Sequence, residues 1–339
     1  MKWAIEPLAT SKDFGELDSF ADTVPNSSIF QTGRMARVYS QSPDTKPLVL
    51  AARSASGEIG ASVAGVTFTH AKRASPISQL SSHFTVRGAP LASSGQESLE
   101  ATRMILQELP NLLSANSVYI RCYPDLEAPT IASLERCGYV REDWLNIVID
   151  LEKGERQLLE GMSKHRRKGI RVAANAGFDV IRVSNTEHLD QLYRLLADTH
   201  RRLRIPFQRR PLFDAAFRDL SSTGNGLMLL AMRADEVLAG RIVLLYRGTA
   251  YDWYAGSTPR GKQLHADEWL TWNAMLLAKE RDAVRFDFGG AGKPDEEYGP
   301  REFKRRFGGR MTNAGRYTRV LARIRFVIAD LAQAVLRRI

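Results

Sequence analysis

The order of predicted secondary-structure elements repeats along the 339-residue chain, and this repeat limits the possible folds more than any other feature. The first half contains a strand pair, a helix and a buried strand, and the second half a three-stranded meander, a helix and a strand. We therefore predict an α/β (α+β) protein with two units in tandem, each a mixed sheet flanked by helices. The elements span residues 47–53, 58–69, 96–113 and 118–122, and then 227–233, 237–246, 249–255, 265–281 and 284–288.

The predicted boundaries follow from this repeat. The first unit should span residues 1–150, and the second, which carries the expected active site, residues 151–316, beginning with a basic helix at 155–174. Residues 317–339 are predicted to form a C-terminal basic amphipathic helix. Its apolar stripe would either pack on its own domain or lie on a membrane surface.

The positive charge of the chain is confined to its second half. Residues 1–150 contain 13 Lys and Arg against 16 Asp and Glu, whereas the remaining 189 residues contain 35 against 22, a net charge of +13. Such a surface attracts phosphate-bearing partners, for example a nucleotide, tRNA, a lipid pyrophosphate or an anionic membrane.

Composition argues against several other classes. No apolar run is long enough to span a membrane, and the N-terminus lacks the apolar core of a signal peptide. We therefore expect a cytoplasmic protein, with peripheral contact at the inner membrane face through the C-terminal helix as an alternative. Cys122 and Cys137 are expected to be reduced structural thiols, and the scattered histidines predict no metal site.

One loop has part of the character of a phosphate-binding loop. Arg260, Gly261 and Lys262 precede the helix predicted from about residue 265, and the free N–H groups of a helix N-terminus favour anions. The loop lacks a second small residue, so it half fits the coenzyme A pyrophosphate loop of acetyltransferases. It is kept as a candidate donor-phosphate loop.

Four stretches of the second half, in order, resemble the FemAB-like family of tandem acetyltransferase-type (GNAT) proteins. These stretches are Met162–Arg171, Tyr254–Ser257, Phe286–Gly290 and Phe303–Gly309. The resemblance implies two GNAT-like domains and covers about residues 145–315 well and the first half loosely. Family members typically move an amino acid from an aminoacyl-tRNA to an amine on a peptidoglycan precursor, and relatives are acetyltransferase-like proteins of exopolysaccharide or cellulose synthesis.

The resemblance also implies site residues. Phe303 and Lys304 match the family's catalytic Phe-Lys pair. Aminolysis of an ester or thioester passes through an oxyanion, which a fixed lysine would stabilise. Lys304 would alternatively neutralise a phosphate on the donor or acceptor, or be a surface lysine in a basic run. Asp287, at the end of a predicted strand, would accept a proton from the amine, anchor Lys304 or serve the turn.

Further residues are expected to bind the substrate. Tyr254 would contact the acceptor, although an aromatic residue in a strand usually belongs to a core. Arg209 and Arg210 precede Pro211 at a predicted helix start and would hold phosphate. The first half has no clear match to the family's acceptor-binding lysine, and Arg37 (or Arg34) is the substitute we predict.

Three functions remain open from the sequence. The first is transfer of an aminoacyl group to an amine of a cell-envelope precursor, with aminoacyl-tRNA as co-substrate and no permanently bound cofactor. The second is acetyl-coenzyme A-dependent transfer in exopolysaccharide synthesis, which would use the Arg260–Lys262 loop. The third is a non-catalytic basic adaptor at a membrane or in a synthase complex.

Overall fold

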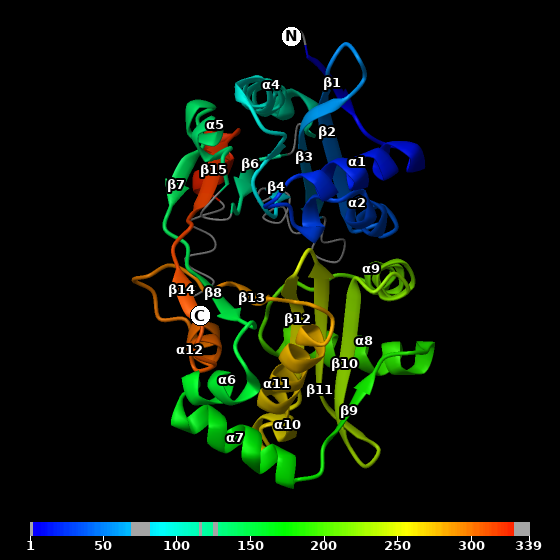
Figure 1. The fold of residues 1–339 in the computed structure, drawn as a ribbon, viewed down its shortest axis with the longest axis vertical. Coiled ribbons are helices and arrows are strands. Elements are labelled where there is room, and N and C mark those ends of the chain that lie inside the picture. Colours follow the sequence, from blue (N-terminus) through cyan, green and yellow to red (C-terminus); the bar gives the residue numbers. More distant parts are fainter. Residues whose placement is uncertain (1–2, 69–81, 115–116, 125–127, 329–339) are drawn as a thin grey trace. The chain divides into compact units, whose positions relative to one another are not determined.

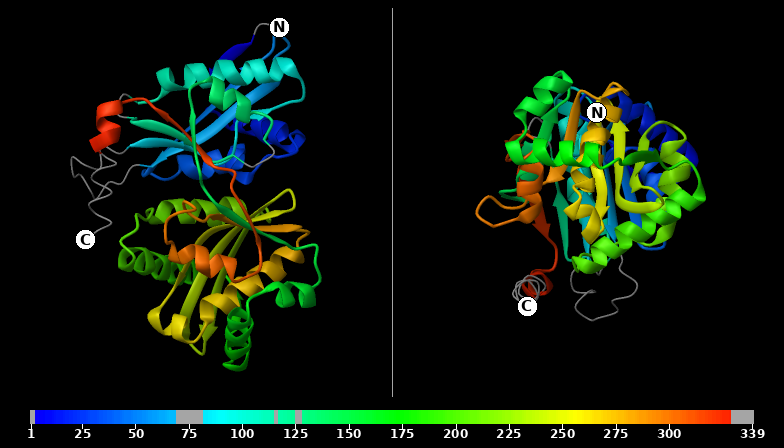
Figure 2. Two further views of the ribbon diagram at one scale, coloured as in Figure 1. Left: turned by 90° about the vertical axis from the view of Figure 1, so that its left-hand side faces the viewer. Right: turned by 90° about the horizontal axis from the view of Figure 1, so that it is seen from below.

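The computed structural model describes residues 3–68, 82–114, 117–124 and 128–328 of the chain. The chain divides into two units, which we call unit 1, Met1–Asp143 with Ala314–Ile339, and unit 2, Trp144–Asn313. Each unit is a mixed sheet covered by helices, as the sequence predicts (Figures 1 and 2).

Unit 1 is built on a sheet with the strand order β1-β2-β3-β4-β6-β15-β7, and β5 pairs with β3. Helix α4 packs against Leu50 and Ala52 on one face, while α1 and α2 pack against Val49 and Ala51 on the other, because neighbouring strand residues point to opposite faces. The elements are β1 Ala4–Pro7, α1 Ser11–Thr23, the 3₁₀ turn Ile29–Gln31, α2 Gly33–Ser40, β2 Thr45–Arg53, β3 Ile59–Phe68, β4 His83–Val86, β5 Leu91–Ala92, α4 Gln96–Leu112, β6 Tyr119–Cys122, α5 Ile131–Arg136, β7 Val140–Glu142 and β15 Arg316–Val320.

Unit 2 has the strand order β14-β8-β13-β12-β11-β10-β9. Alternate residues of β11 divide its two faces: Val243 joins the core beneath α11, whereas Gly240 lies against Leu192 of α8. The elements are β8 Asn146–Asp150, α6 Glu155–Gly161, α7 Lys164–Asn175, β9 Asp179–Arg182, α8 Thr186–Arg202, α9 Arg210–Ala216, the π-helical turn Phe217–Ser221, β10 Gly226–Arg233, β11 Glu236–Tyr246, β12 Thr249–Ser257, α10 Pro259–Gln263, α11 Ala266–Lys279, β13 Arg285–Gly290, α12 Gly299–Arg305 and β14 Arg310–Thr312.

The parallel pairing is equivalent in the two sheets. Among the described strands, β4 pairs in parallel with β6 and β12 with β13, and the other pairs are antiparallel. In both units a long helix, α4 or α11, precedes the second strand of the parallel pair and covers the sheet. This shared topology supports the prediction that the two halves are copies of one fold.

Two sequence predictions at the unit boundaries are wrong. Residues 316–320 form strand β15, which pairs with β6 and β7, so the C-terminal helix does not begin at residue 317. Residues 323–328 are helical, and residues 329–339 lie outside the described part. The first unit does not extend to residue 150, because β8 pairs with β13 and β14 of the second sheet.

The single basic helix predicted at residues 155–174 is two helices, α6 and α7. The chain is extended at Met162 and Ser163, and the Ser163 hydroxyl accepts the Arg166 N–H at 3.2 Å as the N-cap of α7. Cys122 and Cys137 are free and buried, as expected. Among the described helices, none combines the length and the apolar character that crossing a bilayer requires.

Candidate functional site

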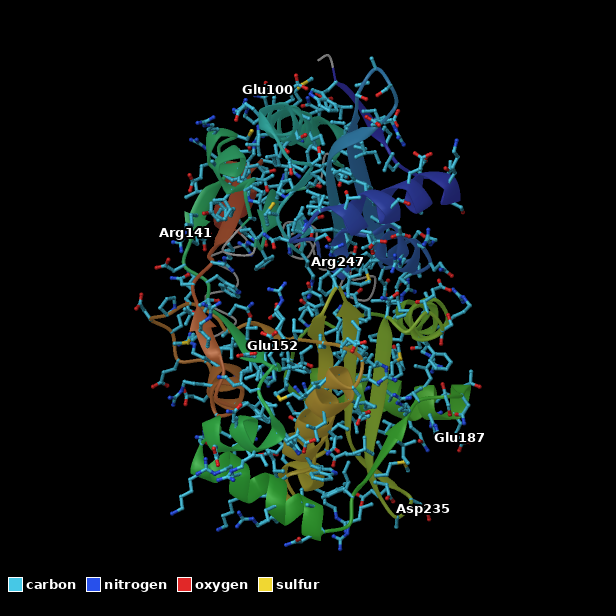
Figure 3. The ribbon with its side chains drawn as sticks, viewed as in Figure 1. Glu100, Arg141, Glu152, Glu187, Asp235 and Arg247 are labelled. Atoms are coloured by element: carbon cyan, nitrogen blue, oxygen red, sulfur yellow. The ribbon has the colours of Figure 1, made fainter. Side chains whose placement is uncertain are left out.

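The strands β12 and β13 of unit 2 pair for only part of their length. The candidate catalytic residues Asp287 and Lys304, and the buried Arg241, lie around the point at which this pairing ends. Their parallel register covers only Thr249–Tyr251 opposite Arg285–Asp287. Beyond it, β12 continues along β11 to Ser257, and β13 follows β8. A β-bulge in the β11–β12 register falls at the same place, opposite Ile242 and Val243. Figure 3 marks the ends of β11 by Arg247 and Asp235, in the turns after and before it.

A buried arginine holds two carboxylates at this point. Arg241 of β11 is 1% exposed, and its guanidinium donates to Asp252 Oδ1 of β12 at 2.5 Å and to Asp267 Oδ1 of α11 at 2.8 Å. Burial disfavours the charge of Arg241, but the two carboxylates outweigh it and raise the pKa of Arg241. Burial also raises the pKa of Asp267, although Arg241 opposes that change. The group is a desolvated ion network that ties one helix to two strands.

Lys304 of α12 lies at the same point. Its ammonium donates to the Gly290 carbonyl at 2.7 Å, and the residue is half-buried. Desolvation by burial lowers the pKa of Lys304, while the neighbouring carboxylates of Asp252 and Asp287 act to raise it. Lys304 is therefore a fixed cation that gives up its proton more readily than an ordinary lysine.

Asp287 has a role at the end of its strand. Its Oδ1 accepts the N–H of Gly289 at 2.7 Å, and Gly289 has a φ of +67°, a left-handed conformation that favours glycine. The side chain thus shapes the turn in which Gly290 presents its carbonyl to Lys304. The structure therefore brings together two of the predicted catalytic residues, Lys304 and Asp287.

Phe303 is fixed by a second buried arginine. Arg166 of α7 is 2% exposed and packs against the rings of both Phe303 and Phe307, each centroid 4.2 Å from the guanidinium carbon. It donates to the Phe303 carbonyl at 2.9 Å and lies 3.0 Å from Glu268 Oε1 of α11. Burial lowers the pKa of Arg166 to about 10, although Glu268 opposes the change. Phe303 therefore anchors the helix that carries Lys304.

The structure does not bring Tyr254 to this group. Tyr254 pairs with Ile242 on the face of the sheet covered by α8, and its ring centroid lies 5.1 Å from that of Phe213 and 5.9 Å from that of His200. Burial lowers the pKa of His200 in this aromatic cluster. The contacts of Tyr254 are those of a packing residue, the alternative that its position in a strand favoured.

The predicted phosphate-binding arginines differ in their surroundings. Arg210 forms ion pairs with Asp190 and with Asp214, and the distance to Asp214 is 2.6 Å. Because two carboxylates already neutralise Arg210, its contacts do not support a role in binding phosphate. Arg209 is the exposed residue before α9. Arg37 belongs to unit 1, where it pairs with Asp18 at 2.9 Å.

The Arg260–Lys262 segment is helix α10, not an open loop. The Gly261 N–H donates to the Thr258 hydroxyl at 2.9 Å, and the Lys262 N–H to the Thr258 carbonyl at 3.0 Å. Arg260 pairs with Glu236. The next helix, α11, begins at Ala266, and the carboxylates of Asp267 and Glu268 already occupy its first turn, where a bound anion would be favoured. These contacts do not support the segment as a donor-phosphate loop.

The sequence patterns did not single out Arg241, Asp252, Asp267 or Glu268, and they included Arg166 only as part of the basic stretch Met162–Arg171. A signal existed for Arg241, since it is the one charged residue inside the apolar run Val237–Tyr246, and a charge in a buried strand needs partners. The partners lie 11 and 26 residues further along the chain, beyond the reach of any local pattern. Among the described residues, no three His, Cys, Asp or Glu side chains gather as metal ligands would.

Comparison with known proteins fits this geometry. Residues 161–305 match the family described as acetyltransferase (GNAT) domain, a segment that includes Arg166, Arg241 and Lys304. FemX has a similar structure, with a TM-score of 0.68 and 16% identity over 95% of this chain and 99% of that one. The chain has a tandem GNAT fold.

Two other solved structures are similar over most of the chain. L-PGS from Bacillus licheniformis gives a TM-score of 0.59 at 14% identity, covering 96% of this chain and 98% of that one. A tandem GNAT protein of the clavulanic acid biosynthesis pathway gives 0.58 at 12% identity, covering 94% and 98%. The search of curated proteins found no match. The comparisons confirm the expected tandem GNAT fold, and the acetyltransferase (GNAT) family that residues 161–305 match supports the expected enzyme class, an acyltransferase.

Proposed function

We propose that this tandem GNAT protein transfers an aminoacyl group from an aminoacyl-tRNA to an amine of a phosphate-bearing cell-envelope precursor, such as a peptidoglycan peptide. The observation that carries the proposal is the setting of Lys304. Lys304 is half-buried, and its ammonium is fixed by the Gly290 carbonyl at 2.7 Å and lies close to Asp252 and Asp287, where β12 and β13 stop pairing. Fixed cations of this kind stabilise the oxyanion of acyl transfer.

The chemistry needs no nucleophilic side chain. The acceptor amine attacks the ester carbonyl carbon, a C–N bond forms, and the carbonyl oxygen becomes an oxyanion beside Lys304. Collapse of the intermediate breaks the C–O bond to the tRNA ribose, whose oxygen takes up a proton while the amine nitrogen loses one. Because the pKa of Lys304 is lowered, its ammonium is suited to stabilising the oxyanion and to donating that proton. Asp252 and Asp287 favour the charged form of Lys304.

The surroundings of α10 and α11 support an aminoacyl ester over a coenzyme A thioester. A coenzyme A pyrophosphate needs free N–H groups and positive potential at a helix N-terminus. In unit 2 the Gly261 and Lys262 N–H groups donate within the protein, and Asp267 and Glu268 place negative charge at the start of α11. The FemAB-like motifs around Phe303 and Lys304 support the same donor.

One observation favours the second function, acetyl-coenzyme A-dependent transfer: the family that residues 161–305 match is that of the GNAT acetyltransferases. In that case Lys304 would act on a thioester carbonyl in the same way. A donor site that uses exposed Lys262 would be the main difference.

The deciding experiment offers the purified chain one donor at a time and measures product mass. We expect aminoacyl addition to a UDP-linked muropeptide from charged tRNA, and no acetyl product from acetyl-coenzyme A. Lys304→Met should lower kcat/KM by at least about a hundredfold, the scale of losing one oxyanion-stabilising group. Ligand-induced rises in melting temperature report binding separately from turnover.

Lys262→Met is the matched control, since it removes an exposed lysine of the same unit. It should leave aminoacyl transfer unchanged. Acetyl transfer that is lost in Lys262→Met would overturn the aminoacyl proposal in favour of the second function. Full activity of a folded Lys304→Met variant would contradict the role of Lys304 in either reaction.

A further inference from the structure

Large exposed aliphatic side chains gather in two short segments of the described chain, one in each unit. In unit 2 these are Leu203 and Ile205, which are 49% and 51% exposed. In unit 1 they are Ile324, Val327 and Ile328, which are 79%, 54% and 44% exposed. Most other exposed large apolar residues of the described chain stand singly along the sequence, as Val140 and Val172 do. We call the two segments, residues 201–205 and 323–328, the apolar-basic segments.

The unit 2 segment is an ordered turn at the end of α8. The N–H groups of Leu203 and Ile205 donate to the carbonyls of Thr199 and His200 at 3.0 and 2.9 Å. Arg202 donates to the Ser257 carbonyl at 2.6 Å. The turn therefore holds both aliphatic side chains outward, in spite of the cost of exposing them to water.

The unit 1 segment is a helical turn fixed by Phe326. The ring of Phe326 lies edge-on to Tyr119 of β6, with centroids 5.3 Å apart, and the Phe326 N–H donates to the Ala322 carbonyl at 2.9 Å. Ile324, Val327 and Ile328 are spaced three and four residues apart and so share one helix face. That face is turned away from the core that Phe326 contacts.

Arginines flank the aliphatic residues in both segments. Arg201, Arg202 and Arg204 surround Leu203, and Arg323 and Arg325 surround Ile324. Arg201 pairs with Asp198 at 2.7 Å. The Arg204 side chain makes no ion pair or hydrogen bond with the described part of the protein, and the contact of Arg202 is to a carbonyl, which leaves its charge uncompensated. Aliphatic side chains beside the uncompensated charges of Arg202 and Arg204, and among further arginines in unit 1, match a bilayer surface with anionic headgroups.

We infer that the protein binds peripherally to anionic membranes through the two apolar-basic segments. A nucleic acid is bound mainly through its phosphates, a contact in which exposed Leu, Ile and Val side chains take no part. A second copy of the chain would need a contact of about 800 Å² per partner, which two or three side chains do not supply. The inference does not rest on the proposed reaction, because lipid binding is measured without donor or acceptor.

The test is co-sedimentation of the full chain with vesicles of phosphatidylcholine alone or mixed with phosphatidylglycerol. We expect binding to the mixed vesicles only, weakened by salt because salt screens the arginines. Leu203→Ser with Ile205→Ser, and separately Ile324→Ser with Ile328→Ser, should each weaken binding by about tenfold or more, since each removes two aliphatic groups that would enter the bilayer. Arg204→Gln should weaken it about fivefold.

Val140→Ser and Val172→Ser are matched controls, since each removes a lone exposed valine. They should bind vesicles like the parent chain, and all variants should keep its melting temperature. Absence of binding to the mixed vesicles, or binding by both double variants as tight as that of the parent chain, would overturn the inference. A change of oligomeric state in either double variant would also overturn it, because the segment would then be a protein–protein contact.

Discussion

Arg166 offers the sharpest test of how unit 2 holds Lys304 in place. Its side chain is nearly inaccessible to solvent, packs against Phe303 and Phe307, and pairs with Glu268 at 3.0 Å. The Arg166→Met substitution keeps an unbranched side chain packed against the two rings. It removes the charge that Glu268 faces and the donor that the Phe303 carbonyl accepts from.

The expected cost follows from these contacts. Removing one partner of a buried ion pair costs about 3–5 kcal/mol, because the other charge stays buried without compensation. This figure already includes most of the hydrogen bond and the cation–π contacts, so they are not added. For a unit of this size, 1 kcal/mol lowers the melting temperature by about 2–4 °C. Arg166→Met should therefore lower the unit 2 transition by roughly 6–20 °C.

The assay is thermal unfolding followed by calorimetry, with Arg156→Ala as the control. Arg156 also pairs with a glutamate, Glu160, but its side chain is 90% exposed, so its loss should not measurably change the transition. Adding Glu268→Gln to Arg166→Met should recover part of the loss, because the unpaired charge is then removed. Equal melting temperatures for Arg166→Met and Arg156→Ala would refute this reasoning.

Three further predictions concern other parts of the chain. Burial lowers the pKa of Lys304 below its usual 10.5. A rate that needs the ammonium should therefore begin to fall at a lower pH than it would for an ordinary lysine. A pH profile of kcat/KM checks this, and a profile that is flat up to pH 10.5 would contradict it. Gly261→Ala would place a Cβ 2.2 Å from the Leu238 carbonyl oxygen and should destabilise unit 2 by about 1–3 kcal/mol. Gly154→Ala is the control, because there is open space around Gly154, and it should not destabilise the unit. Chemical denaturation compares the two variants. Burial raises the pKa of Cys122 and of Cys137, so neither thiol should react quickly with a thiol reagent in the folded chain, and fast labelling of Cys122 would disprove its burial.

Much of the fold could be predicted from periodicity and repetition. The meander at residues 227–255 and the helices near 96–113, 186–202 and 265–281 agree with the structure to within a few residues. The predicted unit boundaries at residues 150 and 316 are wrong because each sheet includes a strand from beyond its expected boundary. The position beside β6 in unit 1 is filled by β15, and the equivalent position beside β13 in unit 2 is filled by β8. Pairing over such separations leaves no mark on local sequence.

Less of the site could be predicted. The Phe303-Lys304 pair and Asp287 were found because their motifs resemble those of a family, and the structure brings Lys304 and Asp287 together. Tyr254 belongs to the same motifs, yet its strand position turns its ring to the α8 face. The side of a strand follows from counting along a regular ladder, and the β-bulge beside Tyr254 breaks that count.

The first turn of α11 connects both buried arginines and explains why unit 2 is poorly suited to an anion there. Asp267 binds Arg241, and the next residue, Glu268, binds Arg166. Carboxylates are favoured at a helix N-terminus by the helix dipole, so this turn can supply two counter-ions at low cost. Arg241 holds Asp252 near Lys304, and Arg166 donates to the carbonyl of Phe303, the residue that precedes Lys304. The positive end of α11, which would otherwise attract a phosphate, thus binds the two carboxylates whose arginine partners position the surroundings of Lys304.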